Sequence, residues 1–312
     1  MSTTAVRPEV LERIKAEGRR PVIASLGGGL DSWSMLLKAT DKGEKPDVVC
    51  FVDVGNCDDR TVPAEWPGTY EYIKKYMVPF AEANGIQWVT LTHHDYPVRD
   101  AASLFEWMHA RKQIPVSGPS RICTTVAKVE RFQRWLDDNF AGQTCEVWLG
   151  FGAEPKEQKR ADRGDPYSKP TKPGPNKANR VNRYPLIEWN VCRCQSAEIV
   201  KEHGFPVPQG SACVFCPYGQ MTDFQTFATA YPELFERVCE LEEQKPKTEN
   251  GYQLTIKGWS KRKLKDGTVK VTEPWLRDWV KGNAAPRREA CPVCGAEEAL
   301  RKTITCGWTE DE

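Results

Sequence analysis

The sequence predicts an α/β protein with a smaller, cysteine-rich and largely helical C-terminal part. Three observations support this prediction. Short apolar runs alternate with helical patterns through the first half of the chain, a glycine triplet follows the first apolar run, and most of the 12 cysteines come after residue 190. An apolar content of 39% in 312 residues is enough for a buried core. We therefore expect a Rossmann-like α/β domain over residues 1–190 and a cysteine-rich region over residues 191–312.

Four segments are predicted as buried strands because they are continuously apolar, with little polar alternation. They are residues 22–26, 48–54, 86–93 and 145–152. Helical patterns lie between them, at residues 32–40, 69–84, 101–112 and 125–140. This β-α-β-α order favours a Rossmann-like, doubly wound parallel sheet with helices on both faces. Ligands of such sheets bind at the carboxyl ends of the strands, and the first strand ends at the glycines.

The stretch ASLGGGLDSWS, residues 24–34, combines a strand exit, three glycines and the start of a helix. Glycines at this point let backbone N–H groups converge, and a helix N-terminus adds partial positive charge. Ser32 adds a hydroxyl donor. No Gly-Lys-Ser/Thr follows, so this is not a Walker A loop. A tight turn without a ligand is the alternative, but the combination favours a phosphate site.

At these residues the chain resembles the PP-loop of N-type ATP pyrophosphatases and, more specifically, the phosphoadenosine phosphosulfate (PAPS) reductase-like family. Gly27 replaces the first serine of the family's Ser-Gly-Gly-x-Asp-Ser motif, and Ser25 lies two residues earlier. Further family-like segments follow in family order across residues 22–217: FVDVG (51–55), RICTTVAKVERF (121–132), RYPLIEW (183–189) and SACVFCP (211–217).

The resemblance implies that the chain binds ATP with Mg²⁺, or PAPS as a substrate. The nucleotide-binding residues it implies are Ser25, Gly27, Gly28, Gly29, Asp31, Ser32, Asp53, Gly55 and Arg160. It also implies catalytic roles for Asp31, Ser32 and Lys128. Asp31 and Asp53 are candidates for binding the metal or its water shell, while Lys128 and Arg160 are candidates for phosphate contacts.

Cys213 and Cys216 have the C-x-x-C spacing of a metal-binding pair. The resemblance adds Cys123, which precedes Lys128 by the spacing of a cluster cysteine in iron–sulfur adenylylsulfate reductases. Thr124 stands where those enzymes have their adjacent second cysteine, so Cys194, or else Cys192, is expected to supply the fourth thiol. Thiolates bind iron–sulfur clusters and zinc alike, and the resemblance favours a [4Fe–4S] cluster.

A second C-x-x-C pair, Cys291 and Cys294, precedes a further thiol at Cys306. These three predict a zinc knuckle, for which His203 or Cys57 is a candidate fourth ligand. Alternatively, TCGW around Cys306 resembles the tail that carries the nucleophilic cysteine of PAPS reductases. Thr305 and Trp308 replace the Glu and His of that tail.

Residues 155–183 carry nine Lys or Arg against three Asp or Glu, with few apolar side chains. We expect a flexible basic loop that clamps a polyanion, either a triphosphate or a nucleic-acid backbone. A solvated loop with incidental charge is the alternative.

The formal net charge of +1 indicates no global attraction to nucleic acid or to a membrane surface. No apolar run reaches the roughly 18 residues that a membrane span needs, and the N-terminal residues have no secretory apolar core. We therefore expect a cytoplasmic protein without a membrane partner, whose cysteines are thiols or metal ligands rather than disulfides.

The function that the resemblance implies is adenylation of an acceptor, for sulfur insertion into a nucleic acid or nucleobase with an Fe–S cluster. Its expected partners are an adenine nucleotide, a nucleic-acid acceptor and a cysteine desulfurase as sulfur donor. One alternative is a PAPS or adenylylsulfate reductase in which Cys306 attacks the sulfonate. The other is a nucleotide-binding or nucleic-acid-binding module without catalysis.

Overall fold

A computed structural model describes ten segments of the chain. They are residues 4–55, 63–116, 122–163, 175–208, 210–246, 254–259, 261–263, 266–271, 275–282 and 290–296. Cys57 and Cys306, and with them the predicted roles of both, lie outside these described residues.

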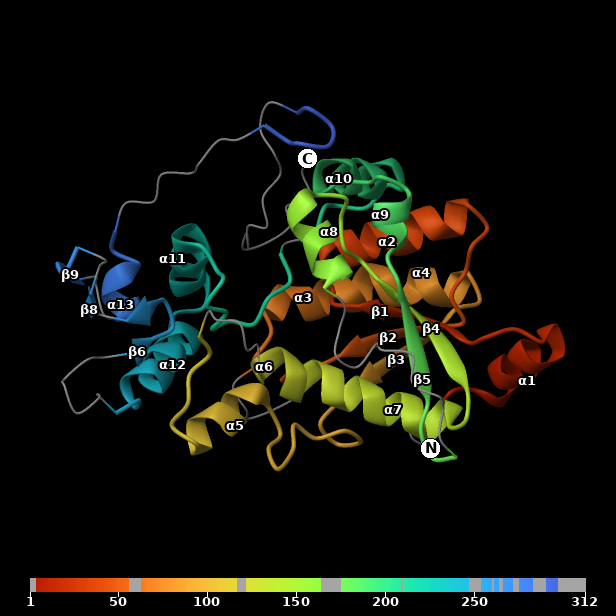
Figure 1. Cartoon of the computed structure of the whole chain (residues 1–312), viewed down its shortest axis with the longest axis horizontal. Coiled ribbons are helices and arrows are strands. Elements are labelled where there is room, and N and C mark those ends of the chain that lie inside the picture. The colour runs from red at the N-terminus through yellow and green to blue at the C-terminus, as the bar shows by residue number, and fades with distance from the viewer. Residues whose placement is uncertain are drawn as a thin grey trace.

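Five parallel strands form the central sheet, in the order β3-β2-β1-β4-β5 (Figure 1). The strands are β1 (Val22–Leu26), β2 (Val48–Val52), β3 (Gln87–Leu91), β4 (Thr144–Leu149) and β5 (Asn179–Arg183). In register, Ser25 of β1 lies beside Cys50 of β2 and beside Leu149 of β4. The chain builds outward from β1 to β3 and then returns to the other side of β1. The predicted doubly wound parallel sheet is confirmed, and its order reverses between β1 and β4.

One face of the sheet is covered by helices that share a core with alternate residues of the strands. These helices are α2 (Leu30–Asp41), α3 (Pro67–Tyr72), α4 (Val78–Ala83), α9 (Pro185–Glu188) and α10 (Arg193–Glu202). A π-helical segment, Ile73–Met77, joins α3 to α4. The buried Oγ atoms of Ser34 and Ser196 lie 2.8 Å apart, and this hydrogen bond ties α2 to α10. Helical packing on the sheet therefore continues past the boundary expected at residue 190, which remains a prediction.

The opposite face is covered by α1 (Pro8–Glu17) and α7 (Glu130–Phe140), as Figure 1 shows. The chain enters α7 through α6 (Ile122–Thr124) and a π-helical turn, Thr125–Val129. π-Helical turns are rare and are often found at functional sites. This one carries Lys128.

The C-terminal part forms a third core together with α5 (Leu104–Ala110). Its helices are α11 (Met221–Ala230), α12 (Pro232–Glu243) and α13 (Leu276–Trp279), and its strands are β6 (Leu254–Thr255), β7 (Gly258–Trp259), β8 (Lys261–Lys263) and β9 (Val269–Val271). Trp66 contacts Phe227 across this core, with ring centroids 4.8 Å apart. The predicted helical, cysteine-rich C-terminal part is therefore present, and it shares its apolar core with residues of the first half.

The basic segment 155–183 differs from the expected loop in its described residues. Its start forms α8 (Pro155–Asp162), with proline in the first turn and Lys159 and Arg160 in the last, where cations suit the helix dipole. Its end forms β5, which pairs with β4. Sheet hydrogen bonds and the packing of Arg183, 5.2 Å from the centroid of Trp148, compensate for the polar composition of this edge strand.

Among the described helices, none combines the length and the apolar character that a membrane crossing requires.

Candidate nucleotide and metal sites

A cavity of about 110 Å³ opens where the strand order reverses, at the carboxyl ends of β1 and β4. Its lining residues are Ser25, Leu26, Gly27, Val52, Lys128, Val129, Phe132, Val147, Leu149 and Arg180. We call it the switch-point cavity. Three residues predicted for the nucleotide site, Ser25, Gly27 and Lys128, thus line the same cavity. Ligands of doubly wound sheets bind at this position.

The glycine loop, residues 27–29, joins β1 to α2 beside this cavity. Gly28 has φ of +73°, and a Cβ there would lie 2.6 Å from Thr69 Cγ2, so both backbone and packing require glycine. A Cβ on Gly27 would meet no atom within 4 Å, so space remains beside the loop. Gly29, the N-cap of α2, provides no side-chain cap for the first N–H groups of this helix. These donors are suited to an anion.

Asp31 and Ser32 occupy the first turn of α2. Both oxygens of Asp31 accept hydrogen bonds from Arg193 Nη1, at 2.9 and 2.8 Å, and each of the two side chains is only 10% exposed. Ser32 Oγ donates to the Gly29 carbonyl at 3.0 Å. The Asp31 carboxylate is therefore held by a buried cation.

Asp53 follows β2 and accepts two hydrogen bonds at Oδ1, from the Tyr70 hydroxyl at 2.6 Å and from the Gly55 N–H at 3.0 Å. Burial raises the pKa of Asp53 to about 6, against the opposing effect of these hydrogen bonds. Gly55 has no room for a side chain, because a Cβ there would lie 2.4 Å from Ala64 N. The carboxyl group is thus enclosed by its neighbours.

The fully buried Arg131 supports the strand ends near Asp53. Its guanidinium donates to the backbone carbonyls of Leu91 at 2.9 Å, Tyr96 at 2.5 Å and Ala127 at 3.0 Å, and also contacts the Asp53 carbonyl. Burial lowers the pKa of Arg131 to about 10, so the group stays charged at neutral pH.

Lys128 connects the switch-point cavity to the three-cysteine group, which we define as Cys123, Cys213 and Cys216. Lys128 Nζ lies 3.8 Å from Glu65 Oε2, and Glu65 is fully buried beside Cys213, with which it forms an antiparallel backbone bridge. Burial raises the pKa of Glu65. Burial lowers the pKa of Lys128, but Glu65 and the three cysteines outweigh this and raise it overall.

The turn that carries Cys213 and Cys216 is held by backbone and side-chain hydrogen bonds. Cys216 N donates to the Cys213 carbonyl at 3.0 Å. Lys257 Nζ donates to the carbonyls of Pro217, at 3.0 Å, and Gly219, at 2.5 Å. Ser211, just before the turn, donates to Glu65 Oε1 at 3.1 Å and contacts the Gly27 carbonyl. The turn is therefore connected to the glycine loop through a single serine.

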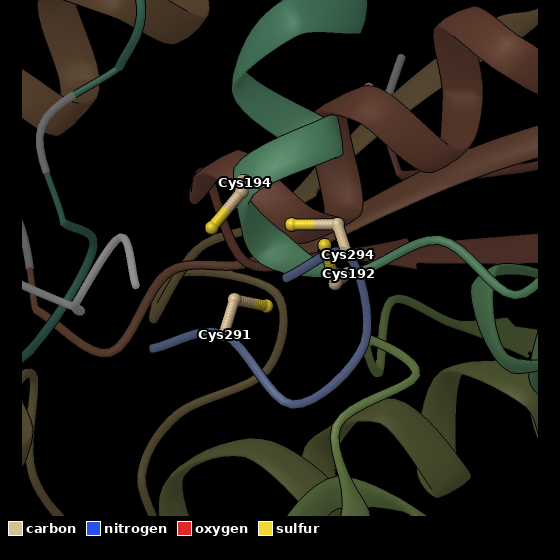
Figure 2. A group of neighbouring side chains, drawn as sticks. All are labelled: Cys192, Cys194, Cys291 and Cys294. Atoms are coloured by element: carbon tan, nitrogen blue, oxygen red, sulfur yellow. The ribbon is translucent and has the colours of Figure 1, made fainter. Parts of the chain in front are cut away.

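A separate set, the four-cysteine group, consists of Cys192, Cys194, Cys291 and Cys294, whose sulfur atoms all lie within 4.8 Å of one another. Figure 2 shows the four side chains as neighbours, two from the start of α10 and two from the knuckle at residues 291–296. Four thiolates at this spacing can hold a metal ion or a cluster. In the described parts of the chain, no other set of three or more Cys, His, Asp or Glu side chains meets this distance criterion.

The knuckle has the backbone geometry of a metal-binding turn. Gly295 N donates to the Cys291 carbonyl at 3.0 Å, Cys291 N donates to the Ala296 carbonyl at 2.8 Å, and Gly295 has φ of +73°. Burial acts to raise the pKa of Cys291, but backbone N–H groups of Cys294 and Val293 donate to its sulfur and bring the pKa down to about 7. The Cys291 thiol therefore ionises more readily than an ordinary cysteine thiol.

Several predicted residues lie elsewhere than expected. Cys194 belongs to the four-cysteine group and not to the set with Cys213 and Cys216. His203 hydrogen-bonds to Asp41 and to the Ile199 carbonyl, and it is not one of the four-cysteine group. Arg160 pairs with Glu157 and packs 4.3 Å from the centroid of Phe151, and it does not line the switch-point cavity.

Sequence reasoning missed three charged residues of these sites. Arg180 lines the cavity, yet it was grouped with the charges of the basic segment. Arg193 has an available signal, because it stands between two cysteines at the start of a helix. Glu65 has none, because its role depends on a pairing with residues near Cys213 that are far away in the sequence.

No family model and no curated protein sequence matches this chain. Among solved structures, the chain is similar to phosphoadenylyl-sulfate (PAPS) reductase from Candida auris in its phosphate complex. The two have 19% sequence identity, the alignment covers 67% of this chain and 82% of that chain, and the TM-score is 0.38. At this TM-score the likeness carries no assignment, and the α/β fold is established by the strand order itself.

Proposed function

We propose that this chain is an adenine-nucleotide enzyme that adenylates an acceptor and releases pyrophosphate, as a step toward sulfur insertion into a nucleic acid or nucleobase. The switch-point cavity is the observation that carries this proposal. There Lys128 lines the same cavity as Gly27 of the glycine loop, Arg180 lines it from the start of β5, and the start of α2 has no side-chain cap. Backbone N–H groups together with two cations suit a triphosphate. The resemblance of residues 24–34 to the PP-loop supports ATP as the nucleotide.

The proposed reaction begins when an acceptor oxygen attacks the α-phosphorus of ATP. The bond from that phosphorus to the bridging oxygen breaks, and pyrophosphate leaves with the electron pair. Lys128 and Arg180 would offset the charge that develops on the leaving group. A sulfur nucleophile at the oxidation level of hydrosulfide then attacks the activated carbon, and AMP leaves.

The carboxylates expected to bind Mg²⁺ are both engaged. Arg193 holds both oxygens of Asp31, and Oδ1 of the nearly buried Asp53 accepts from Tyr70 and Gly55. These contacts do not leave a carboxylate pair open to a divalent ion. No step of the proposed reaction is therefore assigned to Mg²⁺ held by these two residues.

We propose zinc for the four-cysteine group. A Zn–S distance of 2.3 Å in a tetrahedron places the sulfur atoms about 3.8 Å apart, which is inside the 4.8 Å that bounds the sulfur–sulfur distances here. A [4Fe–4S] cluster takes its cysteines on different irons, so its sulfur ligands must surround a larger body. The compact group fits a single ion, which would fix the knuckle against the start of α10.

We propose the three-cysteine group for the iron–sulfur cluster. Its sulfur atoms do not all lie within 4.8 Å of one another, so this group does not match the compact spacing of the four-cysteine group. The raised pKa of Lys128, caused in part by these cysteines, indicates that a cation lies near enough to offset thiolate charge. A bound cluster would supply sulfur or electron chemistry, and Lys128 would separate it from the phosphates.

The test is pyrophosphate and AMP formation from ATP in the presence of total tRNA or of double-stranded DNA, with anaerobically purified protein. We expect product with one acceptor, and its loss in Ser32→Ala and in Lys128→Met. Arg237→Gln, an exposed change on α12, is the control. Sulfite release from PAPS with a thiol reductant, without pyrophosphate formation from ATP, would favour the sulfonucleotide reductase instead.

A further inference from the structure

Arg193 lies between two members of the four-cysteine group and contacts the nucleotide loop. Cys192 is the N-cap of α10 and Cys194 lies in its first turn. The residues directly before and after Arg193 therefore both belong to the four-cysteine group. The side chain of Arg193 hydrogen-bonds to Asp31 at the start of α2. A single residue therefore separates the predicted metal site from the predicted phosphate site.

The backbone around Arg193 is held on the sheet side by hydrogen bonds of its own. Arg193 N donates to Glu154 Oε1 at 2.7 Å, and Ala153 N donates to the Val191 carbonyl at 2.9 Å. Cys192 N donates to Gln195 Oε1 at 2.9 Å. On the other side, only the cysteines connect this turn to the knuckle at residues 291–296 among the contacts described for it.

The electrostatics of the glycine loop depend on where the Arg193 guanidinium lies. Asp31 places a carboxylate in the first turn of α2, beside the N–H groups that would receive phosphate. Unpaired, this charge would repel a polyphosphate; paired with Arg193 at 2.8 Å, it is neutralised. Arg193 Nε is buried and has no acceptor among the described residues, which leaves this nitrogen as a donor for an incoming oxygen.

We propose that metal bound by the four-cysteine group increases nucleotide affinity at the glycine loop, because it holds Arg193 on Asp31. This inference rests on the proposed nucleotide and zinc sites. Binding at Cys192 and Cys194 fixes the backbone on both sides of Arg193. Loss of the metal releases the knuckle and gives this turn more freedom, so that Asp31 spends more time unpaired. By linkage, bound nucleotide strengthens metal binding by the same factor.

The first experiment measures the dissociation constant of ATP by calorimetry for the zinc-loaded and the chelator-treated protein. We expect removal of zinc to weaken ATP binding about tenfold, within the usual range of coupling between two sites. In Arg193→Gln, ATP should bind weakly with or without zinc. Equal sensitivity to zinc in wild type and Arg193→Gln, or no sensitivity in wild type, would overturn the coupling.

The second experiment measures zinc affinity by competition with a chromogenic chelator, which requires no nucleotide. Arg193→Gln should bind zinc about tenfold more weakly, as for other residues that support metal ligands. The exposed variant Arg237→Gln is the control. Unchanged zinc affinity in Arg193→Gln would also overturn the coupling. If no protein binds ATP but Arg193→Gln still weakens zinc binding, the proposed nucleotide site fails while the link between Arg193 and the metal group stands.

A double variant separates this coupling from simple misfolding. Asp31→Asn with Arg193→Gln removes both charges; asparagine keeps the shape of aspartate, and glutamine is a shorter neutral replacement for arginine. We expect this protein to bind ATP more tightly than Arg193→Gln alone, and to do so independently of zinc. Weaker binding in the double variant than in Arg193→Gln would show that charge neutralisation of Asp31 is not the connection.

Discussion

The four-cysteine group and the three-cysteine group use the same ligand atom in different electrostatic surroundings. The first brings four thiols within 4.8 Å of one another, two of them buried and one exposed. The second lies beside a buried carboxylate and has Lys128 as a neighbouring cation. Closely spaced thiolates repel one another unless a cation compensates them, and a metal ion and a lysine are two ways to do so.

The buried carboxyl group of Glu242 provides a further comparison. Glu242 is fully buried and accepts from Ile256 N at 2.7 Å and Leu276 N at 2.5 Å. Burial raises its pKa to about 7, despite these two hydrogen bonds. The three sites therefore differ in how charge is handled: the four-cysteine group would be compensated by the proposed metal, burial raises the pKa of Cys213 and Cys216 despite the opposing effect of Lys128, and Glu242 takes up a proton near neutral pH.

The largest effect should come from removing one thiol of the four-cysteine group. Cys291→Ser and Cys192→Ser should each lower zinc affinity by about 100-fold or more, because a tetrahedral site loses one of its four ligands. Elemental analysis after dialysis against a weak chelator measures this. Cys239→Ala, a buried cysteine of α12 outside both groups, should keep its zinc. Cys213→Ser should keep zinc and lose iron. Loss of zinc in that variant would show that the two cysteine groups are not separate metal sites.

An effect on folding stability should come from changing the charge of Glu242 with pH. Its pKa is raised from 4.5 to about 7, so the folded state binds the proton more tightly than the unfolded state. This contribution to stability is fully present below about pH 4.5 and is lost as the pH rises toward 7, at a total of roughly 3 kcal/mol. Urea unfolding of the wild type and Glu242→Gln across this pH range measures it. A slope in Glu242→Gln as steep as in the wild type would assign the effect to other groups.

Lys128→Met tests the lysine as a compensating cation. It should weaken ATP binding about tenfold to 100-fold, because a charge-assisted hydrogen bond contributes roughly 1.5–3 kcal/mol. Zinc content should not change, because Lys128 contacts the three-cysteine group and not the four-cysteine group. Lys128→Arg keeps the charge and should retain most of the affinity. Unaltered ATP binding in Lys128→Met would leave Lys128 with a structural role only.

The smallest effect should come from the turn of the knuckle. Gly295 has φ of +73°, and alanine in this conformation costs about 1–2 kcal/mol. Gly295→Ala should therefore weaken zinc binding by about fivefold to 30-fold. Gly18, also at positive φ but at the end of α1, is the matched position, and Gly18→Ala should not change zinc affinity. Equal zinc affinity in both variants would show that the turn does not limit metal binding.

The positions of four strands in the first half could be predicted because each of these strands carries its own apolar pattern, whereas their order in the sheet comes from the structure. The β1 to α2 turn was predictable for the same reason, since its glycines and the helix start are contiguous in sequence. β5 was missed because Asn179–Arg183 has one apolar residue, and pairing with β4 decides its structure. The composition of a segment cannot show which strand it will lie beside.

The metal groups were predictable in part. The C-x-x-C spacing at Cys291 and Cys294 indicates a ligand pair, and the structure places both in one group. The partners Cys192 and Cys194 come from a helix start about a hundred residues earlier, and only the tertiary fold brings them there. Sequence spacing finds the local half of such a site, and packing determines the other half.

The contacts of Arg131 have a consequence for how the molecule opens. Its guanidinium donates hydrogen bonds to four backbone carbonyls. These lie just after β2, at the end of β3, in the loop that follows β3, and in the π-helical turn before α7. None of these segments can separate without leaving a buried charge and several carbonyls unsatisfied. In native-state hydrogen exchange, the amides of these segments should therefore exchange through one shared opening reaction, as a single cooperative unit around the cavity.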